Sequence, residues 1–270
     1  MKRSPKDPDY WRRINPQLNI TEAGGAFAEQ QMISRDIMGE GWRENLIEEG
    51  YLQYDSAMPS GRVSRLREGV ENLVQESWPA IYSLVYDDFW NYFADLNPLI
   101  SQILGEEYRM LPDLWVWHID PAKGASGWPP HRDRYINTLR DDGMPQCITI
   151  WAPLSDATPL NGCMSIVPAH LDSDYRNFSK DLVAKPELQT IRALPAPAGS
   201  ILLWNHRLLH WGGASSKRAA EPRISLAFEF QRGDIDTLKK PLLDPDQLPG
   251  FDLRLQFIVK LQAQYLKFTG

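Results

Sequence analysis

The second half of the chain is a series of short runs rich in β-branched and aromatic residues, and this feature limits the folds that the chain can adopt. Gly, Pro, Asn and Asp separate the runs, which are YRML, LWVWHID, CITIWAPL, CMSIVP, LQTIRALP, SILLW and RISLAFEFQ. Seven or more short strands with turn residues between them are typical of an antiparallel sandwich or barrel rather than of an α/β alternation. We therefore expect a β core from about residue 106 to residue 232.

Helical patterns flank this core. Residues 25–50 contain no proline, residues 60–77 open with a serine that can cap a helix, and residues 87–105 carry apolar side chains at helical intervals. The tail, 251–268, places four apolar residues on one helical face: Leu253, Phe257, Leu261 and Tyr265. No composition shift marks a linker, so we expect one domain over 1–270, with a mainly helical part over 1–105 and a helical segment over 233–270.

The charge balance and the apolar runs exclude several classes of partner. A net charge of −6 provides no basic excess for nucleic acid. The longest apolar stretches, such as SILLW, are far too short to span a membrane, and no apolar run follows the charged N-terminus. Cys147 and Cys163 have no CxxC spacing and lie in apolar surroundings, which indicates buried free thiols. We expect a cytoplasmic protein with no nucleic-acid or membrane partner.

The stretch WPPHRDRY, residues 128–135, contains a histidine and an aspartate two positions apart. In a strand such residues project from one face, so His131 and Asp133 could reach one metal ion together while Arg132 points away. A chain with 35 acidic residues can also form this pair by chance in a solvated loop. Taken alone, the pair leaves both interpretations open.

A second imidazole would complete a site of two histidines and one carboxylate, which leaves coordination positions open on iron. His118 and His170 are better explained by local hydrogen bonds, so the choice narrows to His206 and His210 in GSILLWNHRLLHWGG. SILLW indicates a strand, NHRL its turn and LHWGG the next element, which favours His210. The i, i+4 spacing also suits a helical metal pair, although the double glycine after His210 argues against a helix.

The strand pattern that begins at Arg223 places Ser225 on the same face, two residues on. A guanidinium with a neighbouring hydroxyl is a good receptor for a carboxylate, because the planar fork donates two parallel hydrogen bonds. A surface arginine at a strand end is the alternative.

Two further groups of residues allow a structural or a functional interpretation. Thr149 and Trp151 alternate along CITIWAPL, so one face of that strand is expected to line a pocket. For Trp151 and Trp204, ordinary core packing is the preferred role. Three arginines near His131 allow an acidic substrate, although a solvated loop face is the commoner explanation: Arg132, Arg134 and Arg140.

The segments HRD, CITIWAPLSDATPLNGCMSIVPAHL and GSILLWNHRLLHWGGASSKRAAEPRISLAFEF together resemble the phytanoyl-CoA dioxygenase-like branch of the iron(II)- and 2-oxoglutarate-dependent oxygenases. RENLIEEGYLQYD is similar to the family's opening helix-to-strand segment. The resemblance implies a mainly β fold with flanking helices around a double-stranded β-helix, the cupin-like jelly-roll. It also implies that Fe(II) is held by His131, Asp133 and His210, and that Arg223 binds the distal carboxylate of 2-oxoglutarate.

The same resemblance implies the reaction. Fe(II), 2-oxoglutarate and O2 would hydroxylate an unactivated C–H bond of a small-molecule substrate, releasing succinate and CO2. Halogenating members carry a small residue in place of the aspartate, so the presence of Asp133 favours hydroxylation. Ser225 and Thr149 are the further candidates for binding the cosubstrate.

Two other classes stay open at this point. A jelly-roll with two histidines and a carboxylate could bind zinc and act as a hydrolase, although Arg223 and Ser225 would then have no role. The chain could also be a non-catalytic ligand-binding jelly-roll. We expect a monomer or a homodimer, since the apolar tail helix could pair with a second copy.

Overall fold

Two antiparallel sheets pack face to face in the computed structural model, which describes residues 4–27, 32–179 and 185–269. The larger sheet has the strand order β2 (Tyr51–Tyr54), β7 (Ile201–Asn205), β4 (Cys147–Pro153), β9 (Arg223–Gln231) and β3 (Arg109–Ile119). The smaller sheet has the order β6 (Arg192–Leu194), β5 (Met164–Val167) and β8 (Leu209–Gly212), and β1 (Gly25–Ala26) pairs with β10 (Gln247–Leu248). The predicted jelly-roll architecture is confirmed, with two open sheets rather than a closed barrel.

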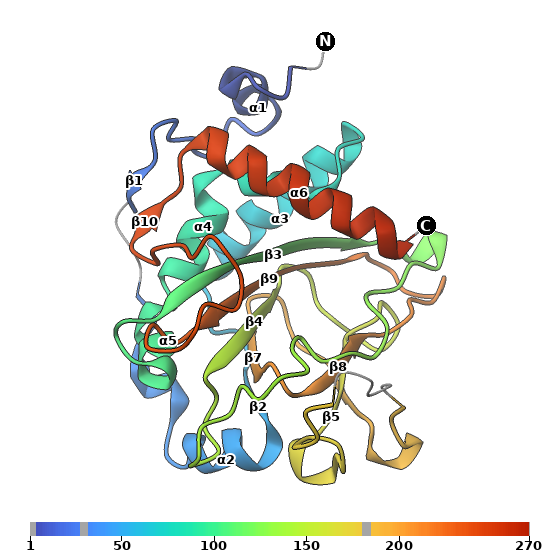
Figure 1. The fold of residues 1–270 in the computed structure, drawn as a ribbon. Coiled ribbons are helices and arrows are strands. Elements are labelled where there is room, and N and C mark those ends of the chain that lie inside the picture. Colours follow the sequence, from blue (N-terminus) through green and yellow to red (C-terminus); the bar gives the residue numbers. More distant parts are fainter. Residues whose placement is uncertain (1–3, 28–31, 180–184, 270) are drawn as a thin grey trace.

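The helices are α1 (Pro8–Ile14), α2 (Trp42–Glu49), α3 (Ser60–Gln75), α4 (Asp87–Ala94), α5 (Asn97–Leu104) and α6 (Phe251–Thr269), with short 3-10 turns η1 (Arg35–Met38), η2 (Ala80–Val85), η3 (Pro121–Lys123), η4 (Ala169–Leu171) and η5 (Leu188–Thr190). The first five α-helices precede β3 in the chain, and α6 follows β10. Figure 1 shows α3, α4 and α6 on one side of the larger sheet and β5 and β8 on the other. None of the helices in the described ranges combines the length and apolar character that a bilayer crossing requires.

The larger sheet is buried on both faces. On the helix side, alternate residues such as Ile150 and Phe228 join a core in which Phe228 stacks on Phe93 of α4, with ring centroids 3.8 Å apart. On the opposite side, Trp151 and Leu202 pack against Met164 and other residues of the smaller sheet. Burial on both faces explains why these strands appear in the sequence as continuous apolar runs rather than as an alternation.

Each predicted β run contains a strand, and YRML and LWVWHID form one continuous strand, β3. RENLIEEGYLQYD forms α2 and β2, as expected. In the predicted helical segment 25–50 only η1 and α2 are helical; residues 25–26 form β1, and 28–31 lie outside the described residues. The expected serine cap is wrong, because Pro59 occupies the N-cap position of α3. Both cysteines are buried and free, as predicted.

The apolar stripe predicted for α6 is only partly correct. Phe257 and Leu261 are buried, but Leu253 is 38% exposed, and the side chain of Tyr265 lies outside the described residues. The buried face instead includes Arg254, whose guanidinium donates 2.7 Å hydrogen bonds to the carbonyls of Val85 and Thr21 and to Asp87 Oδ1. These bonds stabilise the buried charge of Arg254. The spacing of apolar residues along the helix does not predict that an arginine is buried there.

Arg254→Met should lower the free energy of unfolding by about 3–5 kcal/mol, because it leaves the carboxylate of Asp87 buried without its partner. Urea denaturation followed by circular dichroism measures this change. Lys260→Met, at an exposed position of the same helix, is the control and should change stability by less than about 0.5 kcal/mol. Equal stability of the two variants would show that the Arg254 bonds contribute nothing net.

Candidate metal centre

His131, Asp133 and His210 converge in one place, so that a nitrogen or oxygen from each lies within 4.8 Å of the others. Asp133 Oδ1 is 3.6 Å from His131 Nε2 and 3.5 Å from His210 Nε2. Among the described residues, these three are the His, Cys, Asp or Glu side chains grouped closely enough to hold a metal ion. The structure therefore brings together the three residues predicted as metal ligands.

The backbone explains this convergence. His131 forms an antiparallel bridge with His210 in β8, in which the N–H of each residue donates to the carbonyl of the other at 3.0 Å. The N–H of Arg134 donates to the carbonyl of His206 in the turn between β7 and β8, so the loop is tied to the segment 206–210 at two points. The expectation that residues 131–133 form a strand is wrong; the loop places His131 and Asp133 together through these contacts instead.

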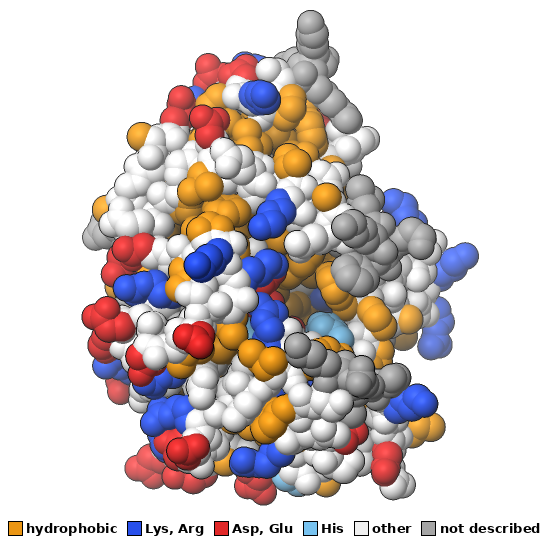
Figure 2. Space-filling view, in the orientation of Figure 1, with side chains coloured by type: hydrophobic (Ala, Val, Ile, Leu, Met, Phe, Trp, Pro, Cys, Tyr) orange, Lys and Arg blue, Asp and Glu red, His pale blue; other side chains and the backbone are white. Residues whose placement is uncertain are grey.

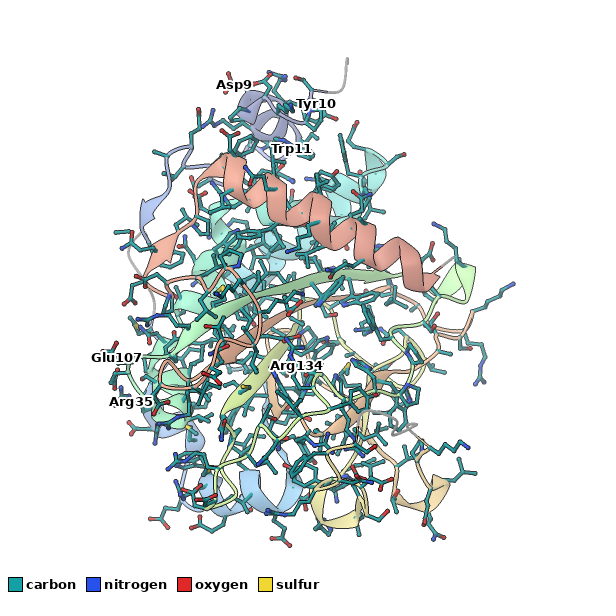
Figure 3. The ribbon with its side chains drawn as sticks, in the orientation of Figure 1. Asp9, Tyr10, Trp11, Arg35, Glu107 and Arg134 are labelled. Carbon is teal, nitrogen blue, oxygen red and sulfur yellow. The ribbon has the colours of Figure 1, made fainter. Side chains whose placement is uncertain are left out.

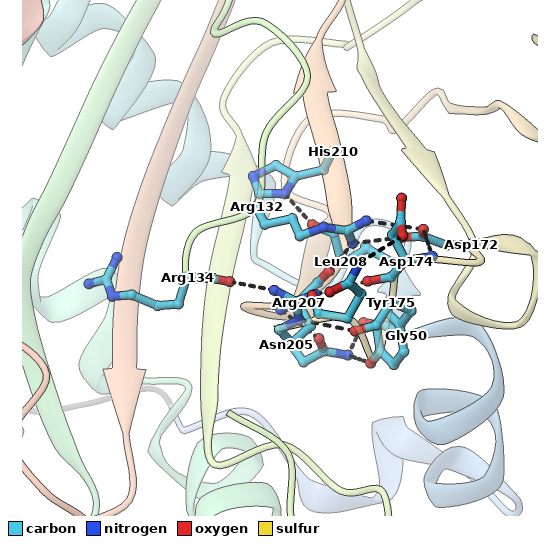
Figure 4. Close-up of polar contacts among 11 residues, drawn as sticks. Gly50, Arg132, Arg134, Asp172, Asp174, Tyr175, Asn205, Arg207, Leu208 and His210 are labelled. Atoms are coloured by element: carbon cyan, nitrogen blue, oxygen red, sulfur yellow. Dashed lines mark hydrogen bonds and ion pairs between the residues drawn. The ribbon is translucent and has the colours of Figure 1, made fainter. Parts of the chain in front are cut away.

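Each imidazole is oriented by a backbone carbonyl. The Nδ1 of His131 lies 2.8 Å from the carbonyl oxygen of Pro129, and that of His210 lies 3.0 Å from the carbonyl oxygen of Leu208 (Figure 4). Because a carbonyl only accepts hydrogen bonds, Nδ1 carries the proton in both rings. In the neutral ring, each Nε2 then presents a lone pair toward Asp133, which is the tautomer that a metal ligand needs.

The carboxylate of Asp133 is held on one oxygen and free on the other. Its Oδ2 accepts a 2.6 Å hydrogen bond from the hydroxyl of Thr149 and a 3.0 Å bond from the indole N–H of Trp204. Thr149 and Trp204 are direct cross-strand partners on β4 and β7. Trp204 packs in the core of the two sheets, as expected, and its bond to Asp133 is an additional role. Its register opposite Thr149 is the feature that could have indicated the contact.

The charges of the three groups fit a divalent cation. Burial alone raises the pKa of Asp133, but the three nearby histidines and the bond from Thr149 lower it to below its ordinary value. Burial lowers the pKa of His210 to about 4, so this ring is neutral at pH 7. The neutral imidazole of His210 thus turns its Nε2 toward a carboxylate oxygen of Asp133 at 3.5 Å, an arrangement that a bound cation stabilises.

Arg223 provides a second, separate feature of the site. It is 1% exposed, and its Nη1 donates to Ser225 Oγ at 2.9 Å, while its Nε has no hydrogen-bond partner among the described residues. Burial lowers its pKa to about 10, which still leaves the guanidinium charged at neutral pH. The alternative of a surface arginine is wrong. A buried cation without an acidic partner is a receptor for an anionic group.

A cavity of about 440 Å³ joins these two features, since the three converging residues, Thr149 and Arg223 all line it. Five tryptophans also contribute to its walls: Trp115, Trp117, Trp128, Trp151 and Trp204. Figure 2 shows the surface hollowed near the middle of this face, with a histidine inside the hollow and apolar and basic side chains at its rim. The volume falls in the range of small-molecule sites, about 300–1,000 Å³.

The three arginines near His131 do not form a solvated face. Arg132 is buried, pairs with Asp172 at 2.6 Å and donates to the carbonyl of Arg207, so it links loops below the site (Figure 4). Arg134 is partly buried at the cavity wall, and its Nη2 is 2.9 Å from both Asp113 and Glu229 (Figure 3). Arg140 is partly exposed and pairs with Asp142.

The remaining histidines lie outside the converging group. His206 is fully buried in the turn between β7 and β8, where burial lowers its pKa to about 4. His118 lies on β3 and His170 on η4. The sequence-based preference for His210 over His206 therefore agrees with the geometry.

The chain is similar to known proteins in both sequence and fold. The sequence profile of the phytanoyl-CoA dioxygenase (PhyH) family matches residues 83–220. No curated protein matches the chain by sequence. Among solved structures, the alpha ketoglutarate dependent epimerase SnoN from nogalamycin biosynthesis is 19% identical, with a TM-score of 0.55 over 75% of this chain and 88% of that one.

Two further solved structures have the same fold. The non-heme monooxygenase ThoJ, as its nickel complex, is 13% identical with a TM-score of 0.58 over 83% of this chain and 97% of that one. HygX from Streptomyces hygroscopicus, with nickel and 2-oxoglutarate bound, is 15% identical with a TM-score of 0.52 over 75% of this chain and 88% of that one.

Proposed function

The chain belongs to the phytanoyl-CoA dioxygenase (PhyH) family of iron(II)- and 2-oxoglutarate-dependent oxygenases, and we propose that it hydroxylates an unactivated C–H bond of a small molecule. The observation that carries this proposal is the presence, in one cavity, of three metal-type ligands and a buried guanidinium that has no acidic partner among the described residues. A zinc hydrolase accounts for the first feature only. Iron with a dicarboxylate cosubstrate accounts for both.

The residues divide into two binding roles. His131, Asp133 and His210 would hold Fe(II) through two nitrogens and one oxygen. Arg223, with the hydroxyl of Ser225 beside it, would hold the distal carboxylate of 2-oxoglutarate. Thr149, proposed from the sequence as a cosubstrate contact, has its hydroxyl bonded to Asp133, which supports a role in orienting that carboxylate.

When bound, iron with 2-oxoglutarate and O2 supplies a two-electron oxidation in which one oxygen atom enters succinate, CO2 leaves, and the other oxygen atom enters the substrate as a hydroxyl. The chain's own part is positioning and protection. Trp204 and Thr149 fix Asp133, the carbonyls of Pro129 and Leu208 fix the imidazoles, and the surrounding indoles exclude water.

Succinate release from 2-oxoglutarate by the Fe(II)-loaded protein, measured without a substrate, tests the oxygenase assignment. A slow release that needs O2 and Fe(II) is expected, whereas a zinc hydrolase or a non-catalytic binding protein would produce none. Solved structures with this fold include an epimerase and a carbocyclase, so the type of reaction needs a separate experiment. In this experiment, a substrate that the protein converts is incubated under ¹⁸O2. Hydroxylation places one labelled oxygen atom in the product, and a product without label would overturn the proposal of hydroxylation.

Trp204→Phe should weaken Fe(II) binding by about tenfold, because it removes one of the two hydrogen bonds that orient Asp133 while keeping an aromatic ring. An anaerobic Fe(II) titration in the presence of 2-oxoglutarate measures this affinity. The matched control is Trp211→Phe, adjacent to His210 in sequence but outside the lining of the metal cavity. An unchanged affinity of Trp204→Phe for Fe(II) would show that the indole does not help to position Asp133.

Gly212→Ala should raise the KM for 2-oxoglutarate by about tenfold or more. A Cβ at position 212 would lie 2.9 Å from Gly127 Cα and 3.1 Å from Arg223 Nη2, so the guanidinium must shift. Gly213→Ala is the control, because its Cβ would meet nothing closer than 3.4 Å. Steady-state kinetics of succinate formation compare the two variants, and equal KM values would show that the guanidinium tolerates the methyl group.

A further inference from the structure

Three tryptophans form a corner of aromatic surface in the metal cavity. Trp115 and Trp117 are two residues apart on β3, with ring centroids 6.2 Å apart and ring planes inclined by only 29°. Trp128, from the loop after η3, meets Trp115 at 5.2 Å and 67° and Trp117 at 6.3 Å and 84°. The first two indoles thus form one wall and the third forms a wall at a steep angle to it. We call these three residues the indole corner.

The indole corner adjoins the metal centre. The ring centroid of Trp128 lies 5.6 Å from that of His131, and all three indoles line the 440 Å³ cavity. Trp117 and Trp128 also line an adjoining cavity of about 560 Å³, so the corner stands where the two cavities meet. A molecule seated against these indoles would lie beside the position where C–H oxidation takes place.

Packing alone does not account for the corner. Trp115 and Trp128 are only partly buried, and all three indoles line the cavity, although Trp115 also packs against both hydrophobic clusters. Apolar surface gathered in a concave site is typical of ligand binding. Aromatic pairs prefer offset-stacked or edge-to-face arrangements, and a corner offers both to one planar ring.

The charges around the corner indicate an uncharged ring rather than a cation. Among the described residues, the acidic side chains that line the cavity are Asp113, Asp133 and Glu229. Asp113 and Glu229 pair with Arg134, and Asp113 also pairs with Lys239, while Asp133 faces the two histidines. Each described carboxylate that lines the cavity therefore already faces basic or imidazole side chains, and none is available to balance an ammonium group beside the indoles.

We propose that the indole corner binds a planar, uncharged aromatic ring of the substrate and so holds a neighbouring C–H bond beside the metal centre. Calling this ring part of the substrate rests on the proposed function, whereas the binding site itself consists of protein side chains. The site can therefore be examined both without metal and in the protein loaded with Fe(II) and 2-oxoglutarate under anaerobic conditions.

Isothermal titration calorimetry with three probes tests the proposal on the full chain. We expect 2-naphthol to bind, 2-decalol, its saturated counterpart, to bind about tenfold more weakly, and tetramethylammonium not to bind. Trp128→Ala should weaken 2-naphthol binding by about 5- to 10-fold, and Trp128→Phe, which keeps a ring, by less than about threefold. Trp42→Ala, at a partly buried position in α2 outside the cavity lining, should leave it unchanged.

Equal affinities for 2-naphthol and 2-decalol, tighter binding of tetramethylammonium, or binding unaffected by Trp128→Ala would each overturn the proposal. The two proposals fail separately. If 2-naphthol binds through Trp128 but Fe(II) and 2-oxoglutarate do not bind, the ring site stands and the oxygenase function falls. If Fe(II) and 2-oxoglutarate bind while 2-naphthol does not, only the ring site falls.

Discussion

His210→Ala should abolish the visible metal-to-ligand charge-transfer band that forms when Fe(II) and 2-oxoglutarate bind anaerobically to the wild-type protein. His210 supplies one of three converging ligand atoms, and its Nε2 is fixed toward Asp133 by the bond from Nδ1 to Leu208. Loss of an outer hydrogen bond at a metal site costs about 10- to 100-fold in affinity, so loss of a direct ligand should cost more than about 100-fold.

Two further histidine variants serve as controls. His206→Ala removes a buried imidazole from the turn just before β8 but leaves all three ligand atoms in place, and the band should persist. His170→Ala, on η4, should have no effect on the band or on thermal stability. If the band survives in His210→Ala, or disappears in His206→Ala while that variant is folded, His210 is not the second imidazole ligand.

Arg223→Ala should raise the KM for 2-oxoglutarate by about 100-fold, equivalent to about 3 kcal/mol, because the distal carboxylate loses the buried arginine of the cavity wall that has no acidic partner among the described residues. Succinate formation at increasing 2-oxoglutarate concentration measures this change. Arg223→Lys should recover only part of the affinity, since an ammonium group cannot reproduce the bidentate fork.

The matched control for this prediction lies just beyond the other end of the same strand. Arg232 is partly exposed and pairs with Asp234, so Arg232→Ala should leave the KM for 2-oxoglutarate within about twofold of the wild type. An unchanged KM in Arg223→Ala would mean that the cosubstrate carboxylate binds elsewhere, and the buried guanidinium would then need another anion.

Sequence reasoning placed the candidate ligands but not the groups that orient them. His131, Asp133 and His210 have residue types that suit a metal, and their order in the chain is visible in the sequence. The bond from Trp204 to Asp133 was not foreseen, because it depends on the register of β7 against β4. The burial of Arg132 was missed for a similar reason, since its partner Asp172 lies in a loop distant in sequence.

Local chemistry explains what the sequence by itself determined: the β core, the flanking helices and the short list of metal-type residues. Runs of β-branched and aromatic residues, turn residues and helical spacing act over a few neighbouring positions, so they can be read from the chain directly. Only the tertiary structure decided that the loop of His131 bridges β8 and that Arg223 is buried with no acidic partner among the residues that the structure describes. It also decided that three indoles meet at a corner beside the metal centre. These features come from contacts between distant segments, whose geometry depends on how the whole core packs.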